Sequence, residues 1–141
     1  MKWKMIAIEY LFPNAVFTRD YIAESTGDED IVITKWNLDD PEPTDKELEA
    51  IKDKAIDAHC MKRIREDRNK LLSDSDWRAN SDVVMSDKWK KYRQDLRDLP
   101  STASPTLNED YSISGVTWPT KPEKSKRRYP KTFRITYLNT S

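Results

Sequence analysis

The sequence predicts an α+β fold: a small N-terminal β-hairpin or sheet, a long helix and a shorter helix paired as an α-hairpin, and an extended C-terminal arm that ends in a strand. Three observations lead to this prediction. Strand-forming residues flank a glycine turn near the front, an uninterrupted run of helix formers follows, and Ser, Thr and Pro dominate after residue 100. These changes in composition predict three regions, at residues 1–43, 44–100 and 101–141.

The composition allows one small hydrophobic core and little more. Of 141 residues, 36% are hydrophobic, against about 45–50% in ordinary globular domains, and 35% are charged. Basic and acidic residues both number 25, so net charge gives no general attraction to nucleic acid or acidic lipid. The distribution is uneven, because residues 1–43 carry 4 basic and 9 acidic groups and residues 100–141 carry 7 and 3. We therefore expect an acidic front and a basic tail.

The N-terminal region is predicted to form short strands and turns. WKMIAIEYLF is rich in strand-forming residues and stops at Pro13. STGDED follows as a turn in which Gly27 supplies a permissive backbone, and IVITKW then alternates with the period of two expected of a strand. NLDDPEP closes the region with two prolines.

The long helix is predicted from a capping box and from the absence of helix breakers. TDKE places Thr44 at the N-cap with Glu47 three residues later, and residues 45–72 contain neither Gly nor Pro. The helix would be about 40 Å long. Its apolar stripe steps by 3, 4 and 3 residues along Leu48, Ile51, Ala55 and Ala58. A stripe with two alanines favours close contact with a neighbouring helix, either the second helix or, in a homo-oligomer through residues 45–72, another copy.

The second helix is predicted over residues 87–99, capped by Ser86 and ended by Pro100. Its apolar residues again step by 3, 4 and 3 and share one narrow face: Trp89, Tyr92, Leu96 and Leu99. Two helices joined by a short polar connector can pack as a hairpin. With Trp77 from the connector, we expect this pairing to be the only substantial core.

The arm after Pro100 lacks helical periodicity and is expected to have little regular structure of its own. Its end, TFRITYL, alternates Phe133, Ile135 and Tyr137 against Arg134 and Thr136, which predicts a strand. A lone strand must pair with another. It either returns to the N-terminal sheet or adds to the edge of a partner's sheet.

The sequence offers no constellation for catalysis, so we expect a protein that is not an enzyme and that has no cofactor. The single His59 neighbours Cys60, but adjacent helix positions point about 100° apart and cannot share a metal. Gly27 and Gly115 are the only glycines, too few for a phosphate-binding loop. The acidic pairs lack the spacing of a calcium loop, so we expect no metal.

The sequence predicts a protein of the cytoplasm, or of a particle assembled there. The single Cys60 cannot form an internal disulfide, which is typical of a reducing compartment. Lys2 and Lys4 precede apolar residues as in a signal peptide, but Glu9 interrupts the run and no small-residue cleavage site follows. No segment approaches the roughly 20 apolar residues that span a bilayer, so we expect no membrane partner.

A basic run in the arm is the best argument for nucleic acid as a partner. Lys124, Lys126, Arg127 and Arg128 precede an aromatic residue. Against this alternative stand the neutral overall charge and the lack of a recognised nucleic-acid-binding fold. We expect the run to be solvated or to face an acidic protein surface.

Five tryptophans are many for so polar a chain. Trp89 is predicted to lie in the core of the hairpin. Trp3, Trp36 and Trp118 lie in or beside strand or arm segments, where they belong either to a core or to an interface, since exposed aromatic residues are favoured anchors in protein–protein contacts.

Three segments, taken in order, resemble one known family. RNKLLSDSDW, WKKYRQDLRDLP and WPTKP are similar to the pattern of the phage tail assembly chaperone family and to the related C-terminal regions of tail-fibre assembly proteins. The front of the chain is more loosely similar to the start of tail-associated proteins from marine and cyanobacterial phages. The main resemblance covers about residues 62–122 and is carried by Arg68, Leu71, Leu72, Asp76, Trp77, Trp89, Tyr92, Arg93, Leu96, Arg97, Leu99, Pro100, Trp118, Pro119 and Pro122.

The resemblance implies a non-enzymatic bacteriophage tail protein that binds a tail, baseplate or tail-fibre protein. It would be either a structural adaptor of the virion tail or an assembly chaperone in the cytoplasm of the infected host. Two features depart from the family pattern. The connector before the second helix usually carries a proline-bearing turn in the family, whereas RANSDVVMS has no proline. The family commonly ends near the Trp-Pro segment, whereas this chain continues past it. The residues expected to bind the partner or to form the core of the module are Trp77, Trp89, Tyr92, Arg93, Leu96, Leu99, Trp118, Phe133, Ile135 and Tyr137.

Overall fold

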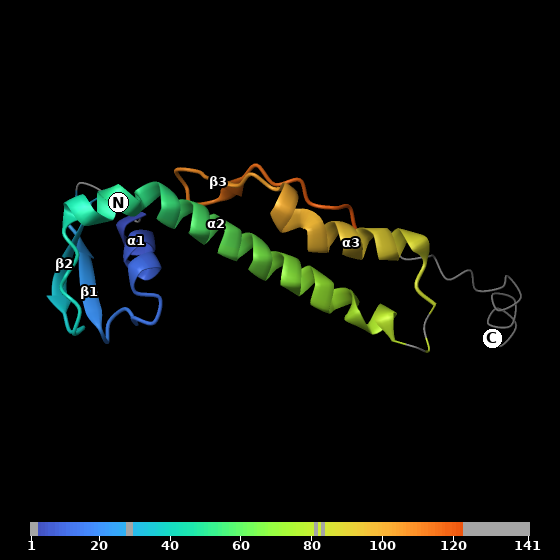
Figure 1. Cartoon of the computed structure of the whole chain (residues 1–141), viewed down its shortest axis with the longest axis horizontal. Helices are drawn as coiled ribbons and strands as arrows, with labels where there is room; N and C mark the ends of the chain where they lie inside the picture. The colour runs from blue at the N-terminus through green and yellow to red at the C-terminus, as the bar shows by residue number, and fades with distance from the viewer. Residues whose placement is uncertain (1–2, 28–29, 81, 83, 123–141) are drawn as a thin grey trace, which may run out of the picture.

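The computed structural model describes residues 3–27, 30–80, 82 and 84–122. A long helix forms the axis of the molecule, with the N-terminal elements packed at its first end and a shorter helix along its second half (Figure 1). The predicted α+β class is confirmed. The predicted strand at Phe133, Ile135 and Tyr137 lies outside the described residues, as does the basic run. The elements are α1 (Trp3–Leu11), β1 (Tyr21–Ser25), β2 (Ile31–Trp36), α2 (Asp45–Ser75), the 3-10 helix η1 (Asp76–Ala79), α3 (Asp87–Thr102), β3 (Thr106–Leu107) and β4 (Ile113–Ser114).

The prediction of a strand in WKMIAIEYLF is wrong, because these residues form the helix α1. Short apolar runs rich in isoleucine do not distinguish a strand from a buried helix by themselves. Tertiary packing decides here: Trp3, Ile6 and Ala7 follow the i, i+3, i+4 spacing of a helical face and are buried. α1 packs against the first half of α2. The helix ends at Leu11, two residues before Pro13.

The predicted small N-terminal sheet is confirmed, with IVITKW as its second strand, β2, but its first strand, β1, was not predicted. The two strands are antiparallel, pairing Ser25 with Ile31 at the turn end and Tyr21 with Trp36 at the other, with an irregularity between Ile22 and Ala23. Gly27 has a φ of 90°, so the turn uses the left-handed conformation that glycine tolerates best.

The capping box at the start of α2 is confirmed. The Glu47 backbone N–H donates to Thr44 Oγ1 at 3.2 Å, and the Thr44 N–H donates to Glu47 Oε2 at 2.8 Å. α2 continues to Ser75, beyond the predicted end at residue 72. The neighbouring helix that its stripe contacts is α1 of the same chain: Leu48 and Ala55 are buried in that contact, with Ile51 packed beside them.

The α3 helix begins as predicted and ends later than predicted. The Trp89 backbone N–H donates to the Ser86 side chain at 3.4 Å, but the helix runs through Pro100 to Thr102. A proline in the last turn removes only one main-chain hydrogen bond, to the carbonyl four residues earlier. The Ala103 N–H still bonds to the Leu99 carbonyl at 2.9 Å, which closes the final turn beyond the proline.

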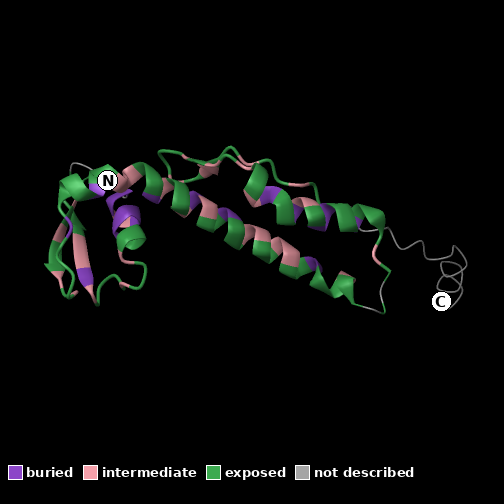
Figure 2. Ribbon diagram, in the orientation of Figure 1, coloured by how far each residue is buried: buried purple, intermediate pink, exposed green. Residues whose placement is uncertain are grey.

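The described residues form two hydrophobic cores, which corrects the expectation of a single core between the two predicted helices. The N-terminal core lies between α1, the β-hairpin and the first half of α2, and the hairpin core lies between α3 and the second half of α2 (Figure 2). Trp77 belongs to neither, with 53% of its surface exposed. The N-terminal core buries Trp3, Ile6, Ala7, Ile8, Tyr21, Leu48 and Ala55, and the hairpin core buries Trp89, Tyr92 and Leu96 against Leu71, Leu72 and Met85.

The arm contains more regular structure than predicted. β3 and β4 pair antiparallel, and Leu107 and Tyr111 pack against the N-terminal core. Gly115 follows β4 with a φ of 79°, and a Cβ at this position would lie 2.2 Å from the Ser104 backbone oxygen. From there the chain runs back along α3 (Figure 1). The arm therefore connects the end of α3 to the N-terminal core.

Candidate protein interface

The α2–α3 hairpin is fastened by a buried arginine. Arg93 is 6% exposed, and its Nη1 donates to the Leu72 carbonyl at 2.9 Å and to Ser75 Oγ at 2.6 Å. Its Nη2 lies 2.8 Å from Asp76 Oδ1. The Leu72 carbonyl is one of the last four of α2, which lack the usual backbone partner within the helix, and it also accepts from the Ser75 hydroxyl at 3.1 Å. Arg93 therefore caps the end of α2 and fixes α3 against it.

The end of the hairpin exposes apolar side chains on this fixed support. We name Trp77, Arg78 and Val84 the hairpin tip. The Arg78 guanidinium carbon lies 4.3 Å from the centroid of the Trp77 ring and 3.9 Å from that of the Trp89 ring. Arg78 is thus stacked against both tryptophans, a favourable cation–π arrangement. Trp77 is 53% exposed and Val84 is 98% exposed.

The predicted stripe of α3 is buried in the structure. Trp89, Tyr92, Leu96 and Leu99 are each less than one tenth exposed. The rings of Trp89 and Tyr92 pack edge to face with centroids 5.6 Å apart. Burial raises the pKa of the Tyr92 hydroxyl. These side chains therefore hold the module together and are not available to a partner.

The other tryptophans divide between core and surface. Trp3 is buried, and Trp36 packs edge to face against Phe12 with ring centroids 5.1 Å apart. The Trp36 Nε1 donates to the Asp40 carbonyl at 2.6 Å. Trp118 in the arm is 37% exposed. The structure thus brings Trp118 and Trp77 to the surface, whereas Phe133, Ile135 and Tyr137 lie outside the described residues.

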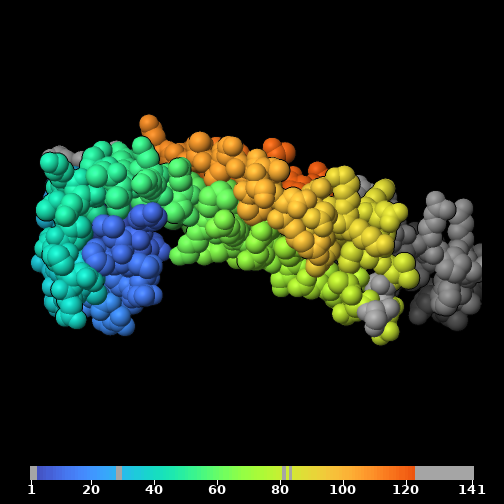
Figure 3. Space-filling view, viewed as in Figure 1, coloured from blue at the N-terminus to red at the C-terminus, as the bar shows by residue number. Residues whose placement is uncertain are grey.

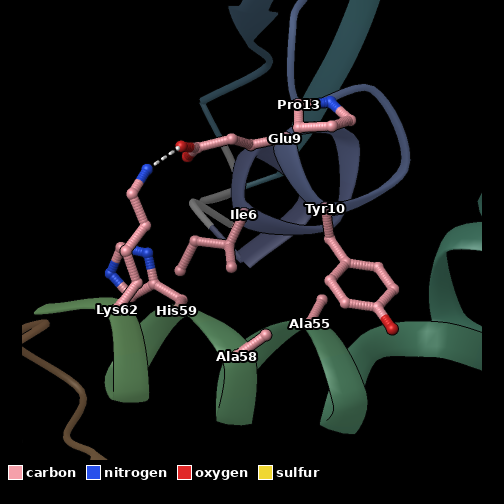
Figure 4. A pocket seen from close by; sticks show the side chains of 8 residues that line it. All are labelled: Ile6, Glu9, Tyr10, Pro13, Ala55, Ala58, His59 and Lys62. Carbon is pink, nitrogen blue, oxygen red and sulfur yellow. Dashed lines mark hydrogen bonds and ion pairs between the residues drawn. The ribbon is translucent and has the colours of Figure 1, made fainter. Parts of the chain in front are cut away.

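A shallow pocket of about 190 Å³ lies in the angle between α1 and α2. Figure 3 shows the hollow between the blue N-terminal elements and the underside of the green helix. Glu9 and Lys62 form an ion pair of 3.1 Å at its rim, and the two alanines leave space at its floor (Figure 4). Burial lowers the pKa of His59, which favours the neutral imidazole. The lining residues are Ile6, Glu9, Tyr10, Pro13, Ala55, Ala58, His59 and Lys62.

His59 and Cys60 lie in different surroundings. His59 faces this pocket, whereas Cys60 is fully buried, and its burial raises the pKa of the thiol. Within residues 3–27, 30–80 and 84–122, no three His, Cys, Asp or Glu side chains lie together as metal ligands would. Across the same described part of the chain, no helix has the length and apolar character needed to cross a membrane.

Sequence reasoning missed Arg78 and Val84 as surface features. The signal for Arg78 was its place directly after Trp77, since guanidinium groups stack on aromatic rings. The sequence indicated Val84 more weakly, because it is simply an apolar residue within a polar connector. The pocket between α1 and α2 had no signal, because it depends on α1 being a helix.

Two family models match consecutive parts of the chain. Residues 4–59 match the model described as XkdW protein, and residues 61–123 match the model described as phage tail assembly chaperone protein. No curated protein sequence gives a significant match, and neither does any solved structure. The second match covers the same segments as the resemblance seen in the sequence and supports a role in phage tail assembly.

The two matches meet inside α2. Helix residues as far as Lys62 contact α1, whereas Leu71 and Leu72 pack against the buried residues of α3. The buried Arg93 and the exposed Trp77 both lie in the second match. Residues 61–123, which contain the fastened hairpin and its tip, thus match the phage tail assembly chaperone model over the region in which the sequence resembles that family.

Proposed function

We propose that this chain is a non-enzymatic phage tail protein that binds a tail, baseplate or tail-fibre protein through the hairpin tip. The match to the phage tail assembly chaperone family supports the setting. The observation that carries the proposal is the exposure of Trp77, at 53%, on a hairpin whose own core already buries the neighbouring aromatic residues. An exposed tryptophan on a rigid support has the character of an interface anchor.

The charges around the tip suit a protein partner. Arg78 covers one part of the Trp77 ring, and tryptophan and arginine are the residue types most enriched among the energetically dominant positions of interfaces. Arg93 holds the end of α2, from which the tip extends, so little conformational entropy remains to be lost on binding. Trp118, also exposed, offers a second aromatic contact from the arm.

The experiment is affinity co-purification of the tagged full-length chain after co-expression with individual tail, baseplate and fibre proteins of the same phage. We expect Trp77→Ala to reduce capture of the true partner at least about tenfold, because truncating a central anchor typically costs 2 kcal/mol or more. Tyr10→Ala is the matched control, since Tyr10 is also exposed and aromatic but lies on α1. Equal capture by the Trp77 variant and the original chain would exclude the tip as the interface.

The two versions of this function differ in whether the chain stays in the virion. A structural adaptor is present in purified particles in a fixed copy number, whereas a chaperone is present in infected cells and absent from particles. Quantitative mass spectrometry of purified virions distinguishes them. We favour the adaptor, because the arm continues past the Trp-Pro segment where the family pattern commonly ends and offers additional length for attachment.

A further inference from the structure

A groove runs beside β2, on the opposite end of the molecule from the hairpin tip. Its volume is about 320 Å³, roughly twice that of a cavity of about 150 Å³ that holds one benzene ring. It is lined by the three consecutive strand residues 31–33 and by the apolar side chains of Ile8, Pro43 and Leu48. Polar side chains complete the lining: Lys4, Glu42, Thr44 and Asp45. The groove is therefore large enough for two apolar side chains.

The strand that borders the groove has one open edge. Among the residues that the structure describes, the sheet has two strands, so β2 is paired there with β1 on one side only. The Thr26 N–H donates to the Asp30 carbonyl at 3.1 Å, which makes residues 26 and 30 a hydrogen-bonded pair. In an antiparallel ladder, hydrogen-bonded pairs alternate with non-hydrogen-bonded pairs. The pairs that contain Ile31 and Ile33 are therefore non-hydrogen-bonded, and the backbone N–H and C=O groups of these two residues point away from β1. Both backbone groups of Ile31 have partners within the chain, because its N–H donates to Asp30 Oδ1 at 2.8 Å and Lys4 Nζ lies 3.5 Å from its carbonyl. The edge that is available to an added strand therefore begins at Ile33.

The sequence contains a segment whose chemistry fits this edge. TFRITYL, residues 132–138, has the alternation of a strand, with Phe133, Ile135 and Tyr137 on one side. Residues 124–141 carry six basic side chains and no acidic one. The groove includes Glu42 and belongs to the acidic front, where residues 1–43 carry 9 acidic and 4 basic groups. Strand addition to an open edge, with alternate side chains in a groove, is a common mode of peptide recognition.

The length of the chain favours a second molecule over the same molecule as the source of this strand. Residues 115–122 run along α3, away from β2 (Figure 1). Nine residues, 123–131, separate that point from the segment and span about 30 Å at full extension. A return within one molecule would require this linker to reverse the direction of residues 115–122 (Figure 1).

We propose that residues 132–138 of one molecule add to β2 of a second copy as the third strand of its sheet. The apolar side of the segment enters the groove, and the preceding cations face the acidic front. The contact is head-to-tail, so each copy both donates a strand and accepts one. This inference is independent of the partner bound at the hairpin tip.

The experiment measures the mass of the full-length chain by size-exclusion chromatography with light scattering over a wide range of concentration. We expect the original chain to exceed the monomer mass of 16.6 kDa as concentration rises. Val32→Lys blocks the groove with a cation at a half-exposed position, and Ile135→Pro breaks the donated strand. Each variant alone should elute as a monomer. Their equimolar mixture should form a dimer of twice the monomer mass, because one variant keeps an intact strand and the other an intact groove.

Matched controls separate this contact from general effects. Val16→Lys places the same charge at a valine of similar exposure, 46%, outside the groove, and Thr140→Pro places a proline beyond the strand segment. Both should associate like the original chain, and circular dichroism should show equal helix content in all variants. Three results would overturn the proposal: a monomeric original chain at every concentration, association that survives both blocking variants, or a mixture that stays monomeric. Protection of β2 from hydrogen exchange in a monomer, lost in Ile135→Pro, would assign the strand to its own molecule and likewise overturn it.

Discussion

The two ends of α2 are stabilised in different ways. The N-terminal unit, which consists of α1, β1, β2 and α2 up to His59, buries seven apolar residues drawn from three elements, and β2 adds partly buried side chains. The hairpin unit, which consists of α2 from Met61, η1 and α3, buries a cluster of three and adds the buried hydrogen bonds of Arg93. A unit with several elements can rely on apolar packing, whereas a pair of helices with a thin stripe gains its fixed geometry from a polar contact. The predictions below test that difference, beginning with the largest expected effect.

Removing a large side chain from either core should unfold mainly the unit that contains it. Leu48→Ala and Trp89→Ala should each cost about 3 kcal/mol or more in the free energy of unfolding, because both side chains are buried and leave cavities. Hydrogen exchange with mass spectrometry should show loss of protection in β1 and β2 for Leu48→Ala and in α3 for Trp89→Ala. If each substitution deprotects both units equally, the units are not separate and the comparison fails.

Replacing Arg93 should lower the stability of the hairpin unit more than replacing Lys4, the buried cation of the N-terminal unit, lowers the stability of that unit. Arg93→Met leaves the Leu72 carbonyl and Ser75 hydroxyl without this donor, which should cost about 1.5–3 kcal/mol. Lys4→Met is the counterpart, since Lys4 is also buried but its side-chain partners, Asp30 and Asp45, are at least half exposed, whereas Arg93 also bonds to the buried Ser75 hydroxyl. Thermal melts of the two variants give the order, and a smaller loss for Arg93→Met would show that apolar packing suffices in the hairpin too.

Substituting alanine for Gly27 and for Gly115 should destabilise the protein to different extents. Gly115→Ala forces a Cβ to within 2.2 Å of the Ser104 backbone oxygen, in addition to the strain of a φ of 79°. Gly27→Ala carries only the strain, about 1–2 kcal/mol, because nothing lies within 4 Å of its Cβ. We expect Gly115→Ala to be the more destabilising and to release Leu107 and Tyr111 from the N-terminal core, which tyrosine fluorescence and hydrogen exchange would detect. Equal melting temperatures would mean that the arm does not depend on this turn.

The smallest effect concerns acid sensitivity at the start of β1. Hydrogen bonds from Arg19 and from the Val16 N–H lower the pKa of Asp20 to about 2. Because the pKa of Asp20 is lower in the folded chain than the ordinary value of 3.8, its ionised carboxylate stabilises the fold above that pH. This stabilisation is lost as the pH falls toward 2. The melting temperature of Asp20→Asn should therefore lie slightly below that of the original chain at pH 5 and converge with it near pH 2. A constant difference across this range would contradict the assignment.

Local signals in the sequence were sufficient for some elements and not for others. The capping box at Thr44 and the stripe of α3 depend on residues within one or two turns, so they were predicted correctly. α1 was mistaken for a strand because its isoleucines suit either structure until α2 is placed beside it. Trp77 was placed in the core because its exposure depends on how far α2 continues. The pocket and the groove involve residues more than 30 positions apart, such as Ile8 and Leu48, and had no local signature.

The unbroken path of α2 through both units has a consequence for how such proteins can vary. In a continuous helix each inserted residue lengthens the axis by about 1.5 Å and turns everything beyond it by about 100°. An insertion of one residue near Cys60 would swing Trp77 to another side of the molecule, whereas seven residues would move it about 10 Å farther with only about 20° of rotation. Natural length variants of this helix should therefore differ in steps near seven or eleven residues, so that both ends keep facing the same direction.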